Sequence, residues 1–190
     1  MNLPNLLTLI RIGLSLLLIG LLPIPGLAAK AVSLALFSAA ALTDLWDGQI
    51  ARRRGLITQF GILMDPIADK VLVLSAFFSF VRLGVAPVWM AALIAARELL
   101  ITGLRLIALA KGKALPAEAA GKIKAAAQMV TISLTLIYLV LIEARPALSE
   151  TVGWVSSGLT FVRALMSVTV LLTLSSGTSF LWHNRRQIFN

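Results

Sequence analysis

The chain has no cysteine and a single histidine, His183, among its 190 residues. Disulfides and thiolate metal sites are therefore excluded, and one imidazole cannot by itself build a histidine-based metal site. A metal ion in this protein would have to bind to oxygen atoms. Charged residues are also scarce, at 13% of the chain, and eight of the 190 residues are acidic.

Apolar residues are abundant: they make up 59% of the chain, and its mean hydropathy is +0.95. Soluble globular chains lie well below these values, so the sequence predicts an all-α integral membrane protein with one membrane-embedded domain over residues 1–190. A spanning helix needs about 20 residues, which leaves room for roughly six. Apolar runs separated by charged or Pro/Gly clusters place six transmembrane helices near 7–28, 30–52, 59–81, 86–110, 120–142 and 154–182.

Basic residues predict how these helices are oriented, because loops rich in Lys and Arg stay on the cytoplasmic side. An even number of spans puts both termini on one side. That side carries Arg52, Arg53, Arg54, Lys111, Lys113, Lys122, Lys124, Arg185 and Arg186, and the other carries Lys30, Arg82 and Arg145. We therefore expect a multi-pass protein of the cell (inner or plasma) membrane with cytoplasmic termini. The net charge of +9 is interpreted as a topology signal, Lys111, Lys113 and Lys124 as charges at the lipid interface, and no nucleic-acid partner is expected.

Four of the eight acidic residues are concentrated in "TDLWDGQIARRRGLITQFGILMDPIADK", residues 43–70. At about 100° per residue, Asp44 and Asp47 fall on one stripe of the second predicted helix. Gly48 and Ala51 share that stripe. The pattern places two carboxylates beside two small residues on one helix face.

The third predicted helix repeats this arrangement with Gly61, Asp65 and Asp69 at i, i+4 and i+8. Counted from the two ends of the intervening loop, Asp47 and Asp65 lie at a similar depth, about 8–9 Å below the membrane interface. A short antiparallel hairpin would bring all four aspartates together.

Such a carboxylate cluster needs cations, because each ionised carboxylate costs about 2.5–3.5 kcal/mol to place in a membrane. Two hard divalent ions, Mg²⁺ or Mn²⁺, would neutralise four aspartates. An ion pair with a neighbouring arginine or a solvated helix end are alternatives for any single aspartate, and a membrane cation transporter is an alternative for the cluster. Gly48 and Gly61 leave space beside the metals, and Arg52 can donate to phosphate, which favours a pyrophosphate site.

The same stretch resembles the signature of the CDP-alcohol phosphatidyltransferases, with all eight defining positions present: Asp44-x-x-Asp47-Gly48-x-x-Ala51-Arg52, then Gly61-x-x-x-Asp65-x-x-x-Asp69. The resemblance implies six transmembrane helices, an active site that faces the cytoplasm, a homodimer, and transfer of a phosphatidyl group from CDP-diacylglycerol to an alcohol with release of CMP. It implies that Asp44, Asp47, Asp65 and Asp69 are metal ligands of a two-metal Mg²⁺ or Mn²⁺ site. Asp69 would also be the general base. The remaining signature residues, Gly48, Ala51, Arg52 and Gly61, would contact the CDP moiety.

Two further regions resemble the members of this family whose acceptor is sn-glycerol 3-phosphate. The opening "NLPNLLTLIRI" contains Asn5 and Thr8, which the resemblance assigns to CDP binding, and Arg11, for which a snorkelling role at the interface is an alternative. "AARELLITGLR" and "AGKIKAAAQM" supply the expected acceptor-phosphate residues Arg97, Arg105 and Lys122. Arg97 could instead pair with Glu98. Cardiolipin synthases and enzymes that accept inositol phosphate are the alternatives within the family, and Arg163 is left without a role.

Overall fold

The computed structural model describes the backbone of residues 3–54, 59–113, 119–144 and 151–189, and the side chains of residues 5–43, 61, 64–113, 119–144 and 155–185. Over these ranges the regular structure is entirely α-helical, which confirms the all-α part of the predicted fold. The six helices are α1 (Leu3–Leu21), α2 (Leu27–Arg54), α3 (Gln59–Arg82), α4 (Val88–Ala110), α5 (Ala119–Glu143) and α6 (Thr151–Phe189).

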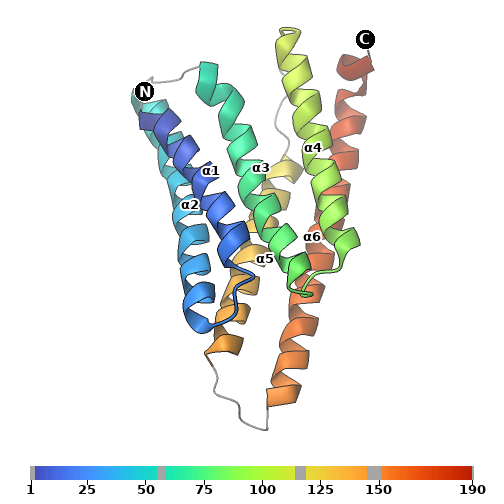
Figure 1. Ribbon diagram of the computed structural model, residues 1–190. Coiled ribbons are helices and arrows are strands. Elements are labelled where there is room, and N and C mark those ends of the chain that lie inside the picture. The colour runs from blue at the N-terminus through green and yellow to red at the C-terminus, as the bar shows by residue number, and fades with distance from the viewer. Residues whose placement is uncertain (1–2, 55–58, 114–118, 145–150, 190) are drawn as a thin grey trace.

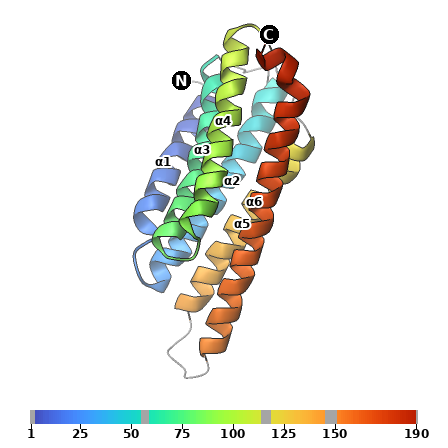
Figure 2. The same ribbon diagram turned by 90° about the vertical axis from the view of Figure 1, so that its right-hand side faces the viewer.

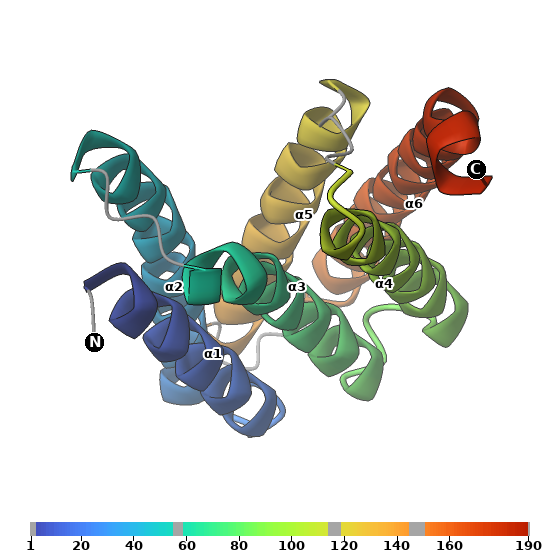
Figure 3. The same ribbon diagram turned by 90° about the horizontal axis from the view of Figure 1, so that it is seen from above.

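The helices run roughly along one axis and form two layers (Figures 1 and 2). Seen from above, α1, α3 and α4 form one layer and α2, α5 and α6 the other (Figure 3). Helix α1 packs closely against both α2 and α3, and α6 packs against α4 and α5. Both ends of the chain lie at the same end of the bundle, where α2 ends and α3 begins (Figure 1).

The first predicted helix, 7–28, is wrong at its end, because α1 stops at Leu21. Hydropathy alone carried the prediction through the turn, since its residues are apolar. Pro23 and Pro25 have no backbone N–H for a helix, and Gly26 has φ of +107°, which favours glycine. Helix α6 departs in the other direction: it continues to Phe189, beyond the apolar run that predicted an end at 182.

Lys30 is also not the loop charge that the sequence predicted. Its side chain is buried, and Nζ donates to the carbonyl oxygens of Leu22 and Ile24 at 2.7 and 2.9 Å. Leu22 and Ile24 lie in the turn after α1, where no helical N–H reaches their carbonyls, and the buried lysine satisfies them instead. Lys30 thus joins the end of α1 to the start of α2.

The outer surface of the bundle is strongly apolar. Within the described residues, Ala119–Glu143 and Val155–Arg185 are long and apolar enough to cross a bilayer, and Asn5–Leu21 and Leu27–Thr43 are shorter apolar helices. Large apolar side chains such as Leu17, Leu99, Val88 and Leu171 are more than half exposed. Contiguous apolar surface of this kind is unusual in soluble monomers and suits contact with lipid.

Helices α5 and α6 approach closely at Gly158. A Cβ atom built there would lie 2.3 Å from Cε2 of Tyr138, whose hydroxyl donates to the carbonyl oxygen of Val155 at 2.9 Å. Farther along the same pair of helices, the buried hydroxyls of Thr131 and Thr169 are 2.7 Å apart. The helix pair is therefore held by a close backbone approach and by polar contacts.

We predict that Gly158→Ala destabilises the protein by about 1–3 kcal/mol, because the Tyr138 ring must move and its hydrogen bond to Val155 is strained. Thermal unfolding in detergent would measure this as a lower Tm. The matched control is Gly13→Ala, where nothing lies within 4 Å of the added atom. Equal Tm values for the two variants would show that the close approach contributes nothing.

Candidate functional site

Helix α3 carries Asp65 and Asp69 one turn apart, as the sequence predicted, so both carboxylates lie on the same side of the helix. Asp65 is exposed and Asp69 is half-buried. Gly61, one further turn toward the start of α3, is buried. The two carboxylates can therefore reach a common ligand, and Gly61 leaves space for that ligand beside them.

Helix α1 contributes to the same site through a contact that the sequence did not predict. Thr8 is fully buried, and its hydroxyl donates to Oδ1 of Asp65 at 2.6 Å. Asn5 lies about one turn before Thr8 and is half-buried. The sequence treated the aspartate site as a hairpin of two helices, whereas α1 packs against both α2 and α3. Thr8, assigned to CDP binding by resemblance, thus contacts a predicted metal ligand.

The remaining predicted ligands belong to the end of α2. Asp44, Asp47, Gly48, Ala51 and Arg52 fall within this helix, but their side chains lie outside the described residues. The four-aspartate cluster therefore stays a prediction. The described carboxylates fit it chemically, because they offer hard oxygen donors, and the Thr8 hydroxyl fixes one of them as metal sites require of their ligands.

A second polar cluster is centred on Glu98 of α4, whose side chain is fully buried. Oε1 of Glu98 accepts hydrogen bonds from Lys124, from Nη1 of Arg97 at 3.3 Å and from Nε2 of Gln128 at 3.2 Å. Oε2 forms an ion pair with Nζ of Lys70 at 3.2 Å. Charges this deep are tolerated when they are paired and hydrogen-bonded, as they are here.

Lys70 connects this cluster to the aspartates, because its Nζ also donates to Oδ2 of Asp69 at 2.6 Å. Three cations, Lys70, Arg97 and Lys124, thus lie around the two carboxylates Asp69 and Glu98. These cations compensate the two carboxylates, which allows the cluster to be buried.

The predicted acceptor-phosphate residues occupy different surroundings. Arg97 pairs with Glu98, the alternative that the sequence left open, and its Nη2 donates to the hydroxyl of Ser176 on α6 at 2.8 Å. Arg105 lies two turns farther along α4, with Cζ 4.9 Å from the ring centroid of Phe180. Lys122 is exposed near the start of α5. Their common role in binding a phosphate stays a prediction.

Two sequence interpretations change with the structure, and Arg163, which the sequence left without a role, can now be placed. Lys124 is not an interface charge, because it is buried against Glu98; the sequence missed this since its lysine neighbours do lie at the surface. Arg11 does not snorkel, because its side chain is fully buried. Arg163 lies at the other end of the bundle, where Nη2 is 3.5 Å from the carbonyl oxygen of Gly84. A signal for Lys70 and Glu98 was present in the sequence: both interrupt apolar runs.

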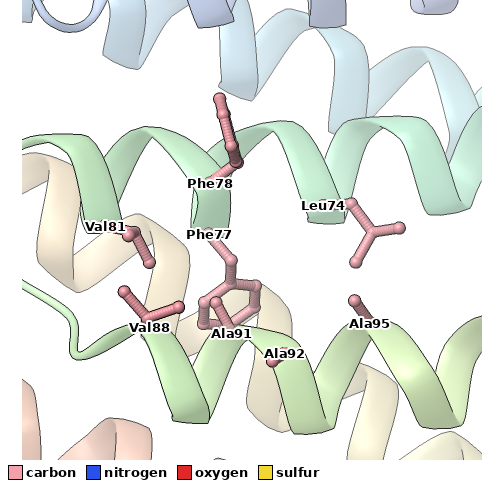
Figure 4. Close-up of a pocket in the computed structure, with 8 residues that line it drawn as sticks. All are labelled: Leu74, Phe77, Phe78, Val81, Val88, Ala91, Ala92 and Ala95. Atoms are coloured by element: carbon pink, nitrogen blue, oxygen red, sulfur yellow. The ribbon is translucent and has the colours of Figure 1, made fainter.

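A pocket of about 300 Å³ between α3 and α4 is distinct from these clusters (Figure 4). Its lining is entirely apolar, from Leu74 and Ala95 at one end to Val81 and Val88 at the other, with Phe77 between them. No group there can transfer a proton or bind a phosphate. The polar clusters of the described residues begin one turn away from this pocket, at Lys70.

Comparison with known proteins gives a consistent result along most of the chain. Residues 1–162 match the model of the CDP-alcohol phosphatidyltransferase family. A probable phosphatidylglycerophosphate synthase of Mycobacterium tuberculosis is 36% identical over 192 residues, covering 98% of this chain and 83% of that protein. A CDP-diacylglycerol–glycerol-3-phosphate 3-phosphatidyltransferase of Bacillus subtilis is 39% identical over 72% of this chain and 77% of its own. The protein of the same name from Rickettsia bellii is 35% identical over 85% and 90%.

We predict that Thr8→Val weakens Mn²⁺ binding about tenfold or more, because Asp65 loses the hydrogen bond that orients it. Electron paramagnetic resonance of the purified protein titrated with Mn²⁺ measures the affinity directly. Thr8→Ser keeps the hydroxyl and should bind Mn²⁺ like the wild type.

The control for this prediction is Ser15→Ala, which removes a buried hydroxyl that donates within its own helix, to the carbonyl oxygen of Arg11 at 2.7 Å. Wild-type affinity in Thr8→Val, or an equal loss in Ser15→Ala, would contradict a specific role for the Thr8 to Asp65 contact.

Proposed function

The chain belongs to the CDP-alcohol phosphatidyltransferase family, and on that premise we propose that it transfers a phosphatidyl group from CDP-diacylglycerol to sn-glycerol 3-phosphate. The products are phosphatidylglycerophosphate, a precursor of phosphatidylglycerol and cardiolipin, and CMP. The observation that carries the acceptor assignment is that relatives from separate bacteria, aligned over 72% to 98% of this chain, bear names for this one reaction.

The reaction needs a group that takes the proton of the acceptor hydroxyl, and Asp69 is the proposed general base. Lys70 holds Oδ2 of Asp69, which leaves Oδ1 as the oxygen that accepts the proton. As the hydroxyl oxygen forms its bond to the phosphatidyl phosphorus, the bond from that phosphorus to the CMP oxygen breaks. The proton goes to Asp69 and the electron pair leaves with CMP.

Asp44, Asp47, Asp65 and Asp69 would hold two divalent cations, Mg²⁺ or Mn²⁺. When bound, these ions would offset the negative charge of the pyrophosphate and of the departing CMP. Thr8 keeps the Asp65 carboxylate in one orientation, and the Thr8 side chain itself is buried between α1 and α3. The residues proposed to contact the CDP moiety are Asn5, Thr8, Gly48, Ala51, Arg52 and Gly61, and those proposed to contact the phosphate of the acceptor are Arg97, Arg105 and Lys122.

The protein is proposed to cross the cell membrane six times, with the site facing the cytoplasm. The start of α1, the end of α2, the start of α3 and the end of α6 lie at one end of the bundle, the end with most basic residues, which supports this orientation (Figure 1). The lipid bilayer then supplies CDP-diacylglycerol, and the apolar outer surface contacts the acyl chains. A homodimer is proposed from the family resemblance, and the mass of the detergent-solubilised protein tests it.

The experiment that tests the function is release of CMP by the purified protein with CDP-diacylglycerol, Mg²⁺ or Mn²⁺, and a panel of acceptors. We expect release with sn-glycerol 3-phosphate and no turnover in Asp69→Asn, which cannot accept the proton. Release only with phosphatidylglycerol or with inositol phosphate would reassign the acceptor. No release with any acceptor, together with cation flux in vesicles, would instead support the transporter.

We predict that Arg105→Ala raises the KM for sn-glycerol 3-phosphate about tenfold or more, because one charge-assisted hydrogen bond to phosphate is lost. Lys122→Ala should act in the same direction. Steady-state kinetics with each substrate varied in turn would separate this from an effect on CDP-diacylglycerol, whose KM should stay nearly unchanged.

The matched control for the acceptor site is Lys111→Ala, which removes an exposed cation at the end of the same helix. It should leave both KM values unchanged. A parallel rise in both KM values in Arg105→Ala would remove Arg105 from the acceptor site.

A further inference from the structure

A row of alternating charges crosses the bundle from α3 through α4 to α5. Asp69 contacts Lys70, Lys70 contacts Glu98, and Glu98 contacts Lys124. The Lys70 ammonium lies between two carboxylates, 2.6 Å from Oδ2 of Asp69 and 3.2 Å from Oε2 of Glu98. Helix α3 packs against both α4 and α5 (Figure 3).

Exposure increases along this row toward Asp69. The side chain of Glu98 is 0% exposed and that of Lys124 is 3%, whereas Lys70 is 20% and Asp69 is 33% exposed. Oε1 of Glu98 is held by Lys124, Arg97 and Gln128, and only Oε2 is turned to Lys70. Glu98 and Lys124, at the buried end of the row, are thus fixed by several contacts. The exposed end of the row is Asp69, which faces the candidate site.

Two observations argue against Lys70 as a purely structural counter-ion. Besides the Oε2 atom of Glu98, Lys70 contacts Asp69, whose side chain is 33% exposed, so this second contact is not needed to offset burial of a charge. Adjacent residues on a helix also point in different directions, so a contact between Asp69 and Lys70 requires the lysine to turn back toward its neighbour. Lys70 is held in this turned-back position by its second partner, Glu98, which lies across the α3 to α4 interface.

We propose that Lys70 is a positioning residue: held by Glu98, it fixes the orientation of the Asp69 carboxylate for proton transfer. The inference rests on the proposed function, in which Asp69 is the base. Because Lys70 occupies Oδ2, the carboxylate cannot rotate freely, and Oδ1 stays directed to the acceptor hydroxyl. A misplacement of reacting groups by about 1 Å can cost on the order of a hundredfold in rate, so such a contact acts mainly on kcat.

The test compares Lys70→Met and Lys70→Arg with the wild type in the CMP-release assay. Lys70→Met should lower kcat by about tenfold or more, since Asp69 loses its partner, and should change each KM by less than about threefold. Lys70→Arg keeps a donor that can contact both carboxylates and should recover most of the lost kcat. Binding of CDP-diacylglycerol without acceptor, measured by calorimetry, should be nearly unchanged in both.

Glu98 is tested through its dependence on Lys70. Glu98→Gln should lower kcat in the wild-type background and cause no further loss when Lys70 is already Met, because its effect passes through Lys70. If Glu98→Gln does not fold, the Lys70 variants decide the matter alone. The control is Lys30→Met, another buried lysine with hydrogen bonds at the opposite end of the bundle, which should lower Tm and leave kcat unchanged.

The outcomes are distinguishable. A kcat in Lys70→Met within about threefold of the wild type would overturn the positioning role and leave the proposed function intact. A lower kcat accompanied by a lower Tm and by weaker substrate binding would do the same, because it would indicate a general loss of structure. A wild-type protein that neither binds CDP-diacylglycerol nor releases CMP would overturn both.

Discussion

Burial of the Glu98 carboxylate among apolar helices is the constraint around which the polar interior is arranged. An unpaired charge at this depth would be very costly, so each of its oxygens must find a donor or a cation. Lys70 comes from α3, Arg97 from α4, and Lys124 and Gln128 from α5. Arg97 extends the set to Ser176 of α6. One acidic residue thus fixes the relative positions of four helices.

The two described aspartates of the candidate site, Asp65 and Asp69, are held by different parts of the bundle. Thr8 reaches Asp65 from α1, and Lys70 reaches Asp69 from within α3 with Glu98 behind it. Each described aspartate therefore has its own partner, although the two lie one turn apart on the same helix. This separate anchoring allows neighbouring carboxylates of like charge to hold different orientations.

The sequence predicted the number of helices and the common face of Asp65 and Asp69, because hydropathy and the helical repeat are local properties. It could not predict the contact of Thr8 with Asp65, since that contact depends on how α1 packs against α2 and α3. Lys124 was misjudged for a similar reason: a lysine near a predicted helix end is usually at the interface, and only the position of Glu98 makes burial favourable. The turn after α1 was missed because its residues are as apolar as the helix.

The distances along the chain between contacting residues set the order in which the protein can be completed during synthesis. Lys30 closes the first hairpin with carbonyls only six and eight residues earlier, so this hairpin can form as soon as α2 has begun. Glu98, in contrast, contacts Lys124 and Gln128, which follow it by 26 and 30 residues and are therefore synthesised later. Until α5 emerges from the ribosome, Arg97 and Lys70 are the cations that can accompany this carboxylate into the membrane.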